Sequence, residues 1–111
     1  MENMNMADMF GRMMDLQKKM ADAQDALADK VTTAEAGGGM IKVTVNGLMK
    51  VKSIKVDPTV VDPSDIELLE DLIVAGVNKA MDEAKVMAQQ EMRNAAGGLM
   101  PPGMNMNDLG F

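Results

Sequence analysis

The sequence contains no cysteine, histidine, tryptophan or tyrosine, and only two of its 111 residues are phenylalanine. The absence of thiols and imidazoles excludes zinc sites built from these ligands, and it also excludes Ser-His-Asp and Cys-His nucleophiles. Disulfide bonds are impossible, which suits a reducing compartment. Because aromatic side chains are so scarce, we do not expect a platform that stacks single-stranded bases. The sequence predicts a protein that is not an enzyme and that uses no cofactor, metal or small-molecule substrate.

Long apolar runs are also missing. No segment is apolar enough over about 18 residues to cross a membrane, and Glu2 and Asp8 stand where a secretory signal would be basic. We therefore expect a cytoplasmic protein without a membrane partner. With 47% apolar and 25% charged residues, the chain has the composition of one small globular domain.

The first element that the pattern predicts is a long helix from Met9 to about Lys30, after flexible residues 1–8. Its apolar residues recur at steps of four and three, as in the heptad seam of a helix. They are Met9, Met13, Leu16, Met20, Ala23 and Leu27. A small domain has little surface to cover so long a seam, so we expect contact with a second chain.

Three strands are expected next, in an antiparallel sheet. Residues 31–36 are rich in β-branched side chains and are typical of an edge strand, and the three glycines at 37–39 turn the chain. Residues 40–46 alternate between apolar and polar side chains, as in a strand with one buried face.

The pair Asn46-Gly47 is a strong hairpin signal. A three-residue loop that ends in a left-handed Gly47 keeps the apolar side chains on one face. This register sets Lys42 opposite Lys50 on the other face. The apolar pattern changes phase after Ser53, which indicates a bulge or the end of pairing.

A second helix is expected from about Asp65 to Asn94, with a capping box in which Ser64 caps the helix and Glu67 reaches back. Gly76 lies on its apolar face, which indicates the close approach of another backbone.

The order of these elements is α-β-β-β-α. It predicts a single α+β domain over residues 9–96, built from two long helices and a three-stranded antiparallel sheet. Residues 97–111 are rich in proline and glycine and are expected to form a flexible tail.

Charge is distributed unevenly along the chain. The formal net charge is −6, yet residues 40–56 carry four lysines and no acidic residue. Like charges on facing positions destabilise a sheet, so Lys42 and Lys50 would need a counter-charge. Three interpretations stay open: a solvated face that resists aggregation, a contact with an anion such as nucleic acid, or ion pairs within the protein.

Several short motifs follow one another along the chain, and we list them in order. They are Met13-Met14, Gln17-Lys18-Lys19-Met20, Gly37-Gly38-Gly39-Met40, Val43-Thr44-Val45-Asn46-Gly47, Val56-Asp57-Pro58, Asp62-Pro63, Leu69-Glu70-Asp71-Leu72-Ile73, Val77-Asn78, Gly97-Gly98 and Pro101-Pro102-Gly103-Met104. Their order and spacing closely resemble the YbaB/EbfC family of bacterial nucleoid-associated proteins, from about residue 9 to the C-terminus.

The resemblance implies a homodimer joined through its sheet region, with helices that project as a tweezer-like pair of arms. It also implies binding to double-stranded DNA with little sequence preference, a place in the nucleoid, and a role in nucleoid organisation and gene regulation. The sequence departs from the family at Asp15, where a basic residue is frequent, and Asp22, Asp25 and Asp29 make the first helix acidic. Because cations at phosphates supply most non-specific DNA affinity, we expect modest, salt-sensitive binding.

The cations expected to contact DNA lie on the arms and on the hairpin, and the arms rank first because the dimer contact would occupy the hairpin. They are Arg12, Lys18, Lys19, Lys30, Lys79, Lys85 and Arg93 on the arms, and Lys42, Lys50 and Lys52 on the hairpin. The residues expected in the dimer interface are Ile41, Val43, Val45, Met49, Val51, Leu72 and Gly76. The alternative is a protein-interaction module whose Met-rich helical surfaces bind a helical partner, with DNA affinity incidental.

Overall fold

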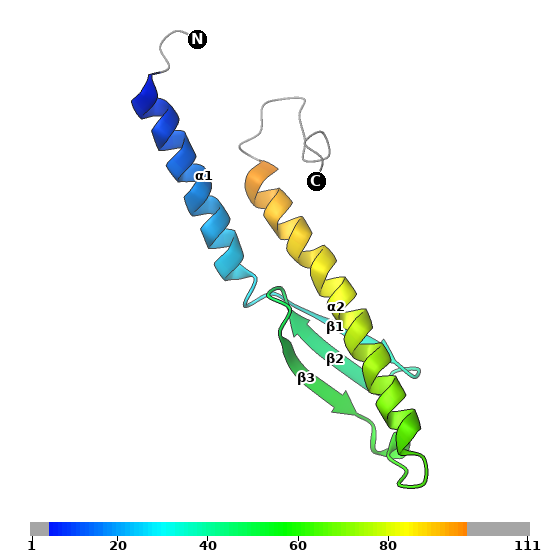
Figure 1. The fold of residues 1–111 in the computed structure, drawn as a ribbon. Helices are drawn as coiled ribbons and strands as arrows, with labels where there is room; N and C mark the ends of the chain where they lie inside the picture. The colour runs from blue at the N-terminus through cyan, green and yellow to red at the C-terminus, as the bar shows by residue number, and fades with distance from the viewer. Residues whose placement is uncertain (1–4, 98–111) are drawn as a thin grey trace.

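The computed structural model describes residues 5–97 and shows two long helices and a three-stranded antiparallel sheet (Figure 1). Helix α1 spans Met6–Ala26 and helix α2 spans Ile66–Gly97. The strands are β1 at Val31–Ala36, β2 at Ile41–Asn46 and β3 at Val51–Val56, followed by a short 3₁₀ turn at Pro58–Val60. The predicted order α-β-β-β-α and the α+β fold class are confirmed.

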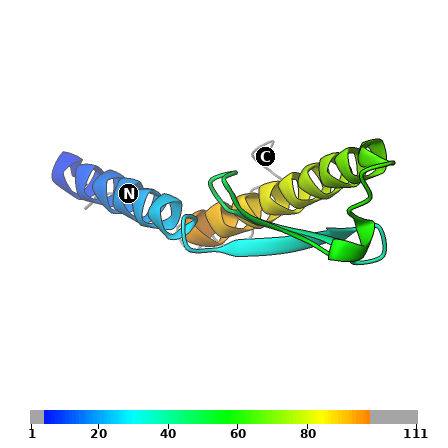
Figure 2. The same ribbon diagram turned by 90° about the horizontal axis from the view of Figure 1, so that it is seen from below.

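The two helices are antiparallel and share only part of their length (Figure 1). The first half of α2 lies along the sheet, and its second half runs beside α1, which projects beyond the sheet. Seen from below, α2 covers one face of the sheet, and no other described element covers the opposite face (Figure 2). Neither helix in residues 5–97 combines the length and apolarity that a membrane span requires.

Helix α1 begins and ends earlier than predicted. The side chain of Asn5 accepts a hydrogen bond from the backbone N–H of Asp8 at 2.8 Å and so caps the helix, which then starts at Met6. Residues 5–8, which the sequence analysis placed in a flexible segment, form the cap and the first turn of this helix. Residues 1–4 and 98–111, where the remaining flexible segments were predicted, lie outside the described part of the chain.

The core forms between the central strand and α2. The sheet order is β1-β2-β3, with β1 at the predicted edge. Ile41, Val43 and Val45 of β2 are fully buried, and α2 packs on them and on β1 through the small residues Ala80 and Ala84. The same row of side chains continues onto β3 as Val51, Ile54 and Val56. There α2 no longer covers it, so Val51 and Ile54 are exposed.

The β2–β3 loop has the predicted three residues but lies two residues further along. Asn46 N–H donates to the Lys50 carbonyl at 2.9 Å, so the loop is Gly47-Leu48-Met49. Its left-handed residue is Met49, with φ of 65°, and the predicted left-handed Gly47 was wrong. The physical reason is the Asn46 side chain, which accepts from the N–H groups of Leu48 and Lys50 and so organises the loop after itself.

This shift changes which lysines face each other. Val45 pairs with Val51 and Thr44 pairs with Ser53, so Lys52 is an extra residue in a bulge. Beyond the bulge Lys42 lies opposite Lys55, and the predicted pairing of Lys42 with Lys50 was wrong.

Helix α2 starts one residue after the predicted boundary and has a different cap. Leu68 N–H donates to the Asp65 carboxylate at 3.3 Å, so Asp65 caps the helix. The hydroxyl and the backbone N–H of Ser64 both donate to Asp62, which holds the pKa of that carboxyl below its usual value. Ser64 is therefore occupied in a turn, and the predicted capping box with Glu67 was wrong.

Gly76 marks the closest approach of α2 to the sheet. A Cβ atom on Gly76 would lie 2.9 Å from Val43 Cγ2 and 3.3 Å from Ile41 Cγ2, both on fully buried side chains. The sequence predicted the approach of another backbone at this glycine, whereas the nearest atoms are side-chain methyl groups. The partner is the chain's own central strand.

We predict that Gly76→Ala lowers the free energy of unfolding by about 1–3 kcal/mol, because overpacking of the core outweighs the gain of about 1 kcal/mol in helix propensity. Gly11→Ala is the matched control, since a Cβ atom on Gly11 would meet nothing within 4 Å. We expect the control to be neutral or stabilising. Urea unfolding at one protein concentration measures both variants, and equal stability of the two would contradict the interpretation.

Candidate nucleic-acid interface

The charge of each element decides where a polyanion can bind. Helix α1 carries three cations against four aspartates, and α2 carries three cations against six acidic residues. The hairpin from Ile41 to Val56 carries four lysines and no acidic residue. Among the described elements, the hairpin therefore has the highest density of positive charge.

The uncovered face of the sheet presents two of these four lysines, Lys42 and Lys55, to solvent. Two neighbouring rows of polar side chains cross the three strands there. The first row is Glu35, Lys42 and Lys55, and the second is Thr33, Thr44 and Ser53. All six are exposed except Thr44, which is half-buried. We call this surface the basic sheet face.

The lysines of the first row outnumber their counter-charge. Lys42 Nζ lies 3.8 Å from Glu35 Oε1, and Lys55 faces Lys42 from the other side. The row thus carries two ammonium groups and one exposed carboxylate, which pairs with Lys42, and the facing lysines repel each other. In the second row the hydroxyls of Thr33 and Thr44 hydrogen bond at 2.7 Å. The face is flat and positively charged, and its hydroxyls can donate to phosphate oxygens.

Lys55 was missing from the predicted set of DNA contacts. Its position opposite Lys42 depends on the bulge at Lys52, which moves the register of β3 by one residue. The signal was present in the sequence as the phase change after Ser53, but the pattern did not show where the extra residue lies. Lys50 and Lys52, which were predicted, are both exposed at the loop end of β3.

The cations predicted on α1 are exposed but lie among acids. Arg12 stands four residues after Asp8 and three before Asp15, and Lys19 stands four after Asp15. Residues three or four apart are neighbours on a helix surface, so these aspartates weaken the positive potential of the arm. Lys18 is also three residues from Asp15 and lies in the same acidic environment.

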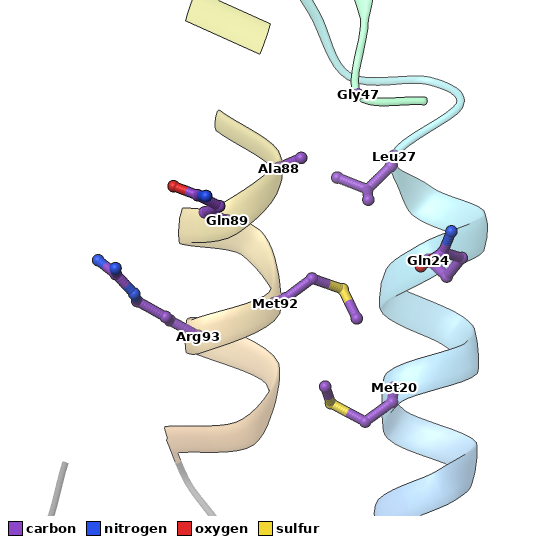
Figure 3. A pocket seen from close by; sticks show the side chains of 8 residues that line it. All are labelled: Met20, Gln24, Leu27, Gly47, Ala88, Gln89, Met92 and Arg93. Carbon is purple, nitrogen blue, oxygen red and sulfur yellow. The ribbon is translucent and has the colours of Figure 1, made fainter. Parts of the chain in front are cut away.

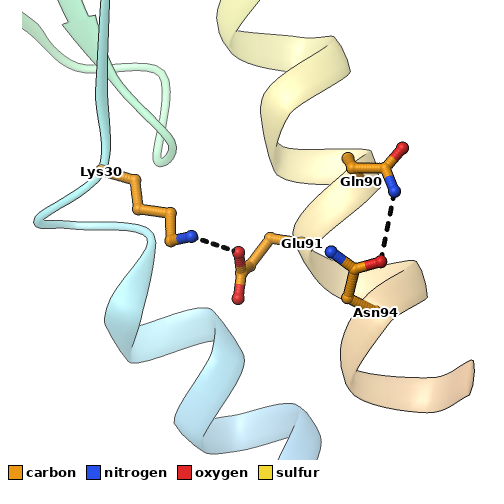
Figure 4. Close-up of polar contacts among 4 residues, drawn as sticks. All are labelled: Lys30, Gln90, Glu91 and Asn94. Carbon is orange, nitrogen blue, oxygen red and sulfur yellow. Dashed lines mark hydrogen bonds and ion pairs between the residues drawn. The ribbon is translucent and has the colours of Figure 1, made fainter. Parts of the chain in front are cut away.

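Lys30 is occupied within the subunit. It follows α1 and forms an ion pair with Glu91 of α2, next to the hydrogen bond between Gln90 and Asn94 (Figure 4). The remaining predicted cations, Lys79, Lys85 and Arg93, are exposed at separate positions along α2. The structure does not gather them into one cluster.

A groove of about 520 Å³ separates the end of α1 from α2. Met20 of α1 and Leu27, which caps that helix, point toward α2 across the groove (Figure 3). On α2 they face Ala88 and Met92, whereas Arg93 points away from α1. The groove walls are mostly apolar and contain no catalytic group. Toward the N-terminus of α1 the predicted apolar seam is uncovered, and Met9, Met13 and Leu16 are exposed.

The residues predicted for a dimer interface divide into two groups. Ile41, Val43 and Val45 are buried beneath α2 in the chain's own core, and Gly76 of α2 is buried against them. These four residues leave no surface for a partner. Leu72 is half-buried against the same core. Met49 and Val51 are exposed, and Ile54, which the prediction omitted, is exposed beside them at 41%.

Comparisons with known proteins agree on one family. A family model described as the YbaB/EbfC DNA-binding family matches residues 1–99. A nucleoid-associated protein of Syntrophobacter fumaroxidans is 54% identical over 94 residues, covering 85% of this chain and 86% of the relative. One of Chlorobium luteolum is 42% identical over 106 residues, covering 96% of this chain and 95% of the relative.

A solved structure supports the fold. The crystal structure of an uncharacterized protein from Helicobacter pylori matches with a TM-score of 0.66 at 19% identity, over 89% of this chain and 100% of that chain. At this identity the likeness concerns the arrangement of helices and strands.

The facing lysines generate a prediction about stability. We expect Lys55→Glu to raise the free energy of unfolding by about 0.2–1 kcal/mol, because a carboxylate replaces an ammonium group opposite Lys42. Lys85→Glu changes the net charge equally at an exposed helix position and should not stabilise the protein. Thermal unfolding at low salt measures both, and a Lys55→Glu variant less stable than the control would contradict the expected repulsion.

Proposed function

Because this chain belongs to the YbaB/EbfC DNA-binding family, we propose that it binds double-stranded DNA as a homodimer with little sequence preference. In this proposal it acts in the nucleoid, as the names of its relatives suggest, and it contributes to nucleoid organisation and gene regulation. The observation that carries the proposal is the basic sheet face, an open surface of lysines in a chain of net charge −6.

The chemistry of the basic sheet face suits phosphates better than bases. Ammonium groups that replace counterions along the DNA backbone supply affinity without reading the sequence. The hydroxyls of Thr33, Thr44 and Ser53 can add hydrogen bonds to phosphate oxygens. No helix or ribbon of the described residues projects from this sheet surface to enter the major groove. Weak sequence preference follows from these features.

The helical arms remain the second candidate surface. The resemblance ranked them first, but the aspartates of α1 lower the potential at Arg12, Lys18 and Lys19, and Lys30 is paired with Glu91. For this reason we rank the basic sheet face before the arms.

Two double substitutions separate the surfaces. Lys42→Glu with Lys55→Glu should weaken binding to a short duplex strongly, and Lys18→Glu with Lys19→Glu should weaken it less, although both pairs change the net charge equally. Titrations between about 50 and 200 mM salt should also show a smaller salt dependence for the sheet pair, by about 0.9 in the logarithmic slope for each lost phosphate contact.

Three outcomes would change the proposal. If Lys18→Glu with Lys19→Glu lowered duplex affinity more than Lys42→Glu with Lys55→Glu, the proposed interface would move to α1. Equal losses would mean that only the overall charge matters. If the wild-type protein bound no duplex even at low salt, DNA binding itself would be refuted.

Homodimerisation is supported by the apolar row that β3 leaves open. Val51 and Ile54 continue the buried row of β2, yet they are 38% and 41% exposed because α2 covers only β1 and β2. Apolar residues in the continuation of a core are a natural place for a second subunit. The proposed interface therefore lies on the α2 side of the sheet and leaves the basic sheet face free.

We predict a dimeric mass for the wild-type protein by light scattering. Ile54→Glu should shift the mass toward the monomer, because it buries a carboxylate in the proposed interface. Val86→Glu is the matched control, since Val86 is an exposed apolar residue of α2, at 65%, away from this row. A monomeric wild type would refute the dimer, and equal effects of both variants would place the interface elsewhere.

A second candidate function rests on the outer half of α1. Met9, Phe10 and Met13 are all more than half exposed, and Met-rich helix surfaces adapt well to helical partners. A protein-interaction module of this kind becomes the leading hypothesis if the duplex titrations show no binding.

A further inference from the structure

The tip of the β2–β3 hairpin is joined to the C-terminal end of α1. Gly47 N–H donates to the carbonyls of both Leu27 and Lys30, each at 2.9 Å. The last carbonyls of a helix have no partner within the helix and need donors from elsewhere. Leu27 is the C-cap residue of α1, and its carbonyl also accepts from Lys30 N–H at 3.3 Å, so Gly47 adds a second donor. The hairpin is thus hydrogen bonded to the segment that directly follows α1.

Asn46 links the same two segments through its side chain. It is 3% exposed, and its Nδ2 donates to the Ala28 carbonyl at 3.2 Å. Its Oδ1 accepts from Leu48 N–H at 2.9 Å and from Lys50 N–H at 3.0 Å. The side-chain oxygen thus orders the hairpin loop, while the side-chain nitrogen connects this loop to Ala28, in the segment that follows α1. Only an amide side chain of this size offers both functions in a buried position.

Gly47 is needed at this joint for space. A Cβ atom on Gly47 would lie 2.8 Å from Leu27 Cβ and Cδ2 and 2.9 Å from the Leu27 carbonyl oxygen. Leu27 is itself buried and points toward α2 across the groove (Figure 3). Any larger residue at position 47 must push the end of α1 away from the sheet.

Few side chains of α1 are buried. Only Ala23 is buried within the helix, Met20 is half-buried, and the residues before it are exposed. A groove separates this part of α1 from α2, and the ion pair of Lys30 with Glu91 lies at the same end of the helix as the joint. The direction of this 21-residue helix therefore depends on its packing beside α2 together with the joint at its C-terminal end.

We propose that Asn46 and Gly47 are positioning residues, which hold α1 at a fixed angle to the basic sheet face. Lys50 directly follows the same loop and donates its N–H to Asn46, so the start of β3 and the end of the arm are joined in one hydrogen-bonded unit. The consequence for DNA, that the cations of sheet and arm are presented in constant geometry, rests on the proposed function.

The closing experiment uses the absence of cysteine in the chain. Spin labels on Met13→Cys and Val74→Cys, both exposed, report the distance between α1 and α2 by pulsed electron paramagnetic resonance. Dilution with unlabelled chain removes distances between subunits. The wild type should give one narrow distribution.

Asn46→Asp separates the two functions of Asn46. The carboxylate keeps both acceptors for the loop but places an oxygen against the Ala28 carbonyl. The distribution should broaden at neutral pH and narrow again at acid pH, where the protonated carboxyl can donate to Ala28. A merely destabilised protein would not recover on acidification. Gly47→Ala should shift the distribution at every pH, and Gly11→Ala, which meets nothing within 4 Å, should leave it unchanged.

Wild-type distributions in both Asn46→Asp and Gly47→Ala would overturn the proposal, as would broadening in Asn46→Asp that acid does not reverse. Duplex affinity is measured on the same samples and should fall about tenfold in Gly47→Ala, as for the loss of one well-placed contact. A shifted distance with unchanged affinity would refute positioning for DNA while keeping the joint. Absence of wild-type DNA binding would refute the proposed function, and the distances would still test the joint.

Discussion

The close contact of α2 with the central strand is the constraint on which the other features depend. Gly76, Ala80 and Ala84 let the helix lie directly on β2, where Val43 and its neighbours are fully buried. A helix this close to β2 covers β1 and β2 but not β3, because its width spans little more than two strands spaced about 4.8 Å apart. One apolar edge and one whole polar face of the sheet are left uncovered.

The two uncovered surfaces differ in chemistry. The edge continues the apolar row of the core through Val51 and Ile54, whereas the opposite face carries Lys42, Lys55 and a row of hydroxyls. A homodimer joined at the edge would keep both basic sheet faces open. Facing lysines cost stability, and this arrangement is understandable in a family of DNA-binding proteins, because a phosphate backbone supplies the missing counter-charge. The acidic remainder of the chain would confine DNA to that surface.

Much of the fold could be predicted from local pattern. Heptad spacing, strict alternation and glycine clusters depend on neighbours in sequence, and they identified both helices and all three strands. Two of the errors lie where neighbouring polar groups compete for the same partner. Ser64 fits a cap, but Asp62 takes its hydroxyl and leaves the cap to Asp65. The candidate site was predicted less completely, since Lys55 joins Lys42 only after a bulge whose position the pattern did not reveal.

By itself the sequence determined the order of elements, the absence of thiol and imidazole groups, and the concentration of lysine in the hairpin. Each of these is a property of composition or of short-range periodicity. Only the tertiary structure decided which lysines face each other, which apolar residues α2 covers, and that Asn46 and Gly47 hydrogen bond to the segment that follows α1. The physical reason is that register, burial and long-range hydrogen bonds are chosen by contacts between segments. The chain brings those segments together only when it folds.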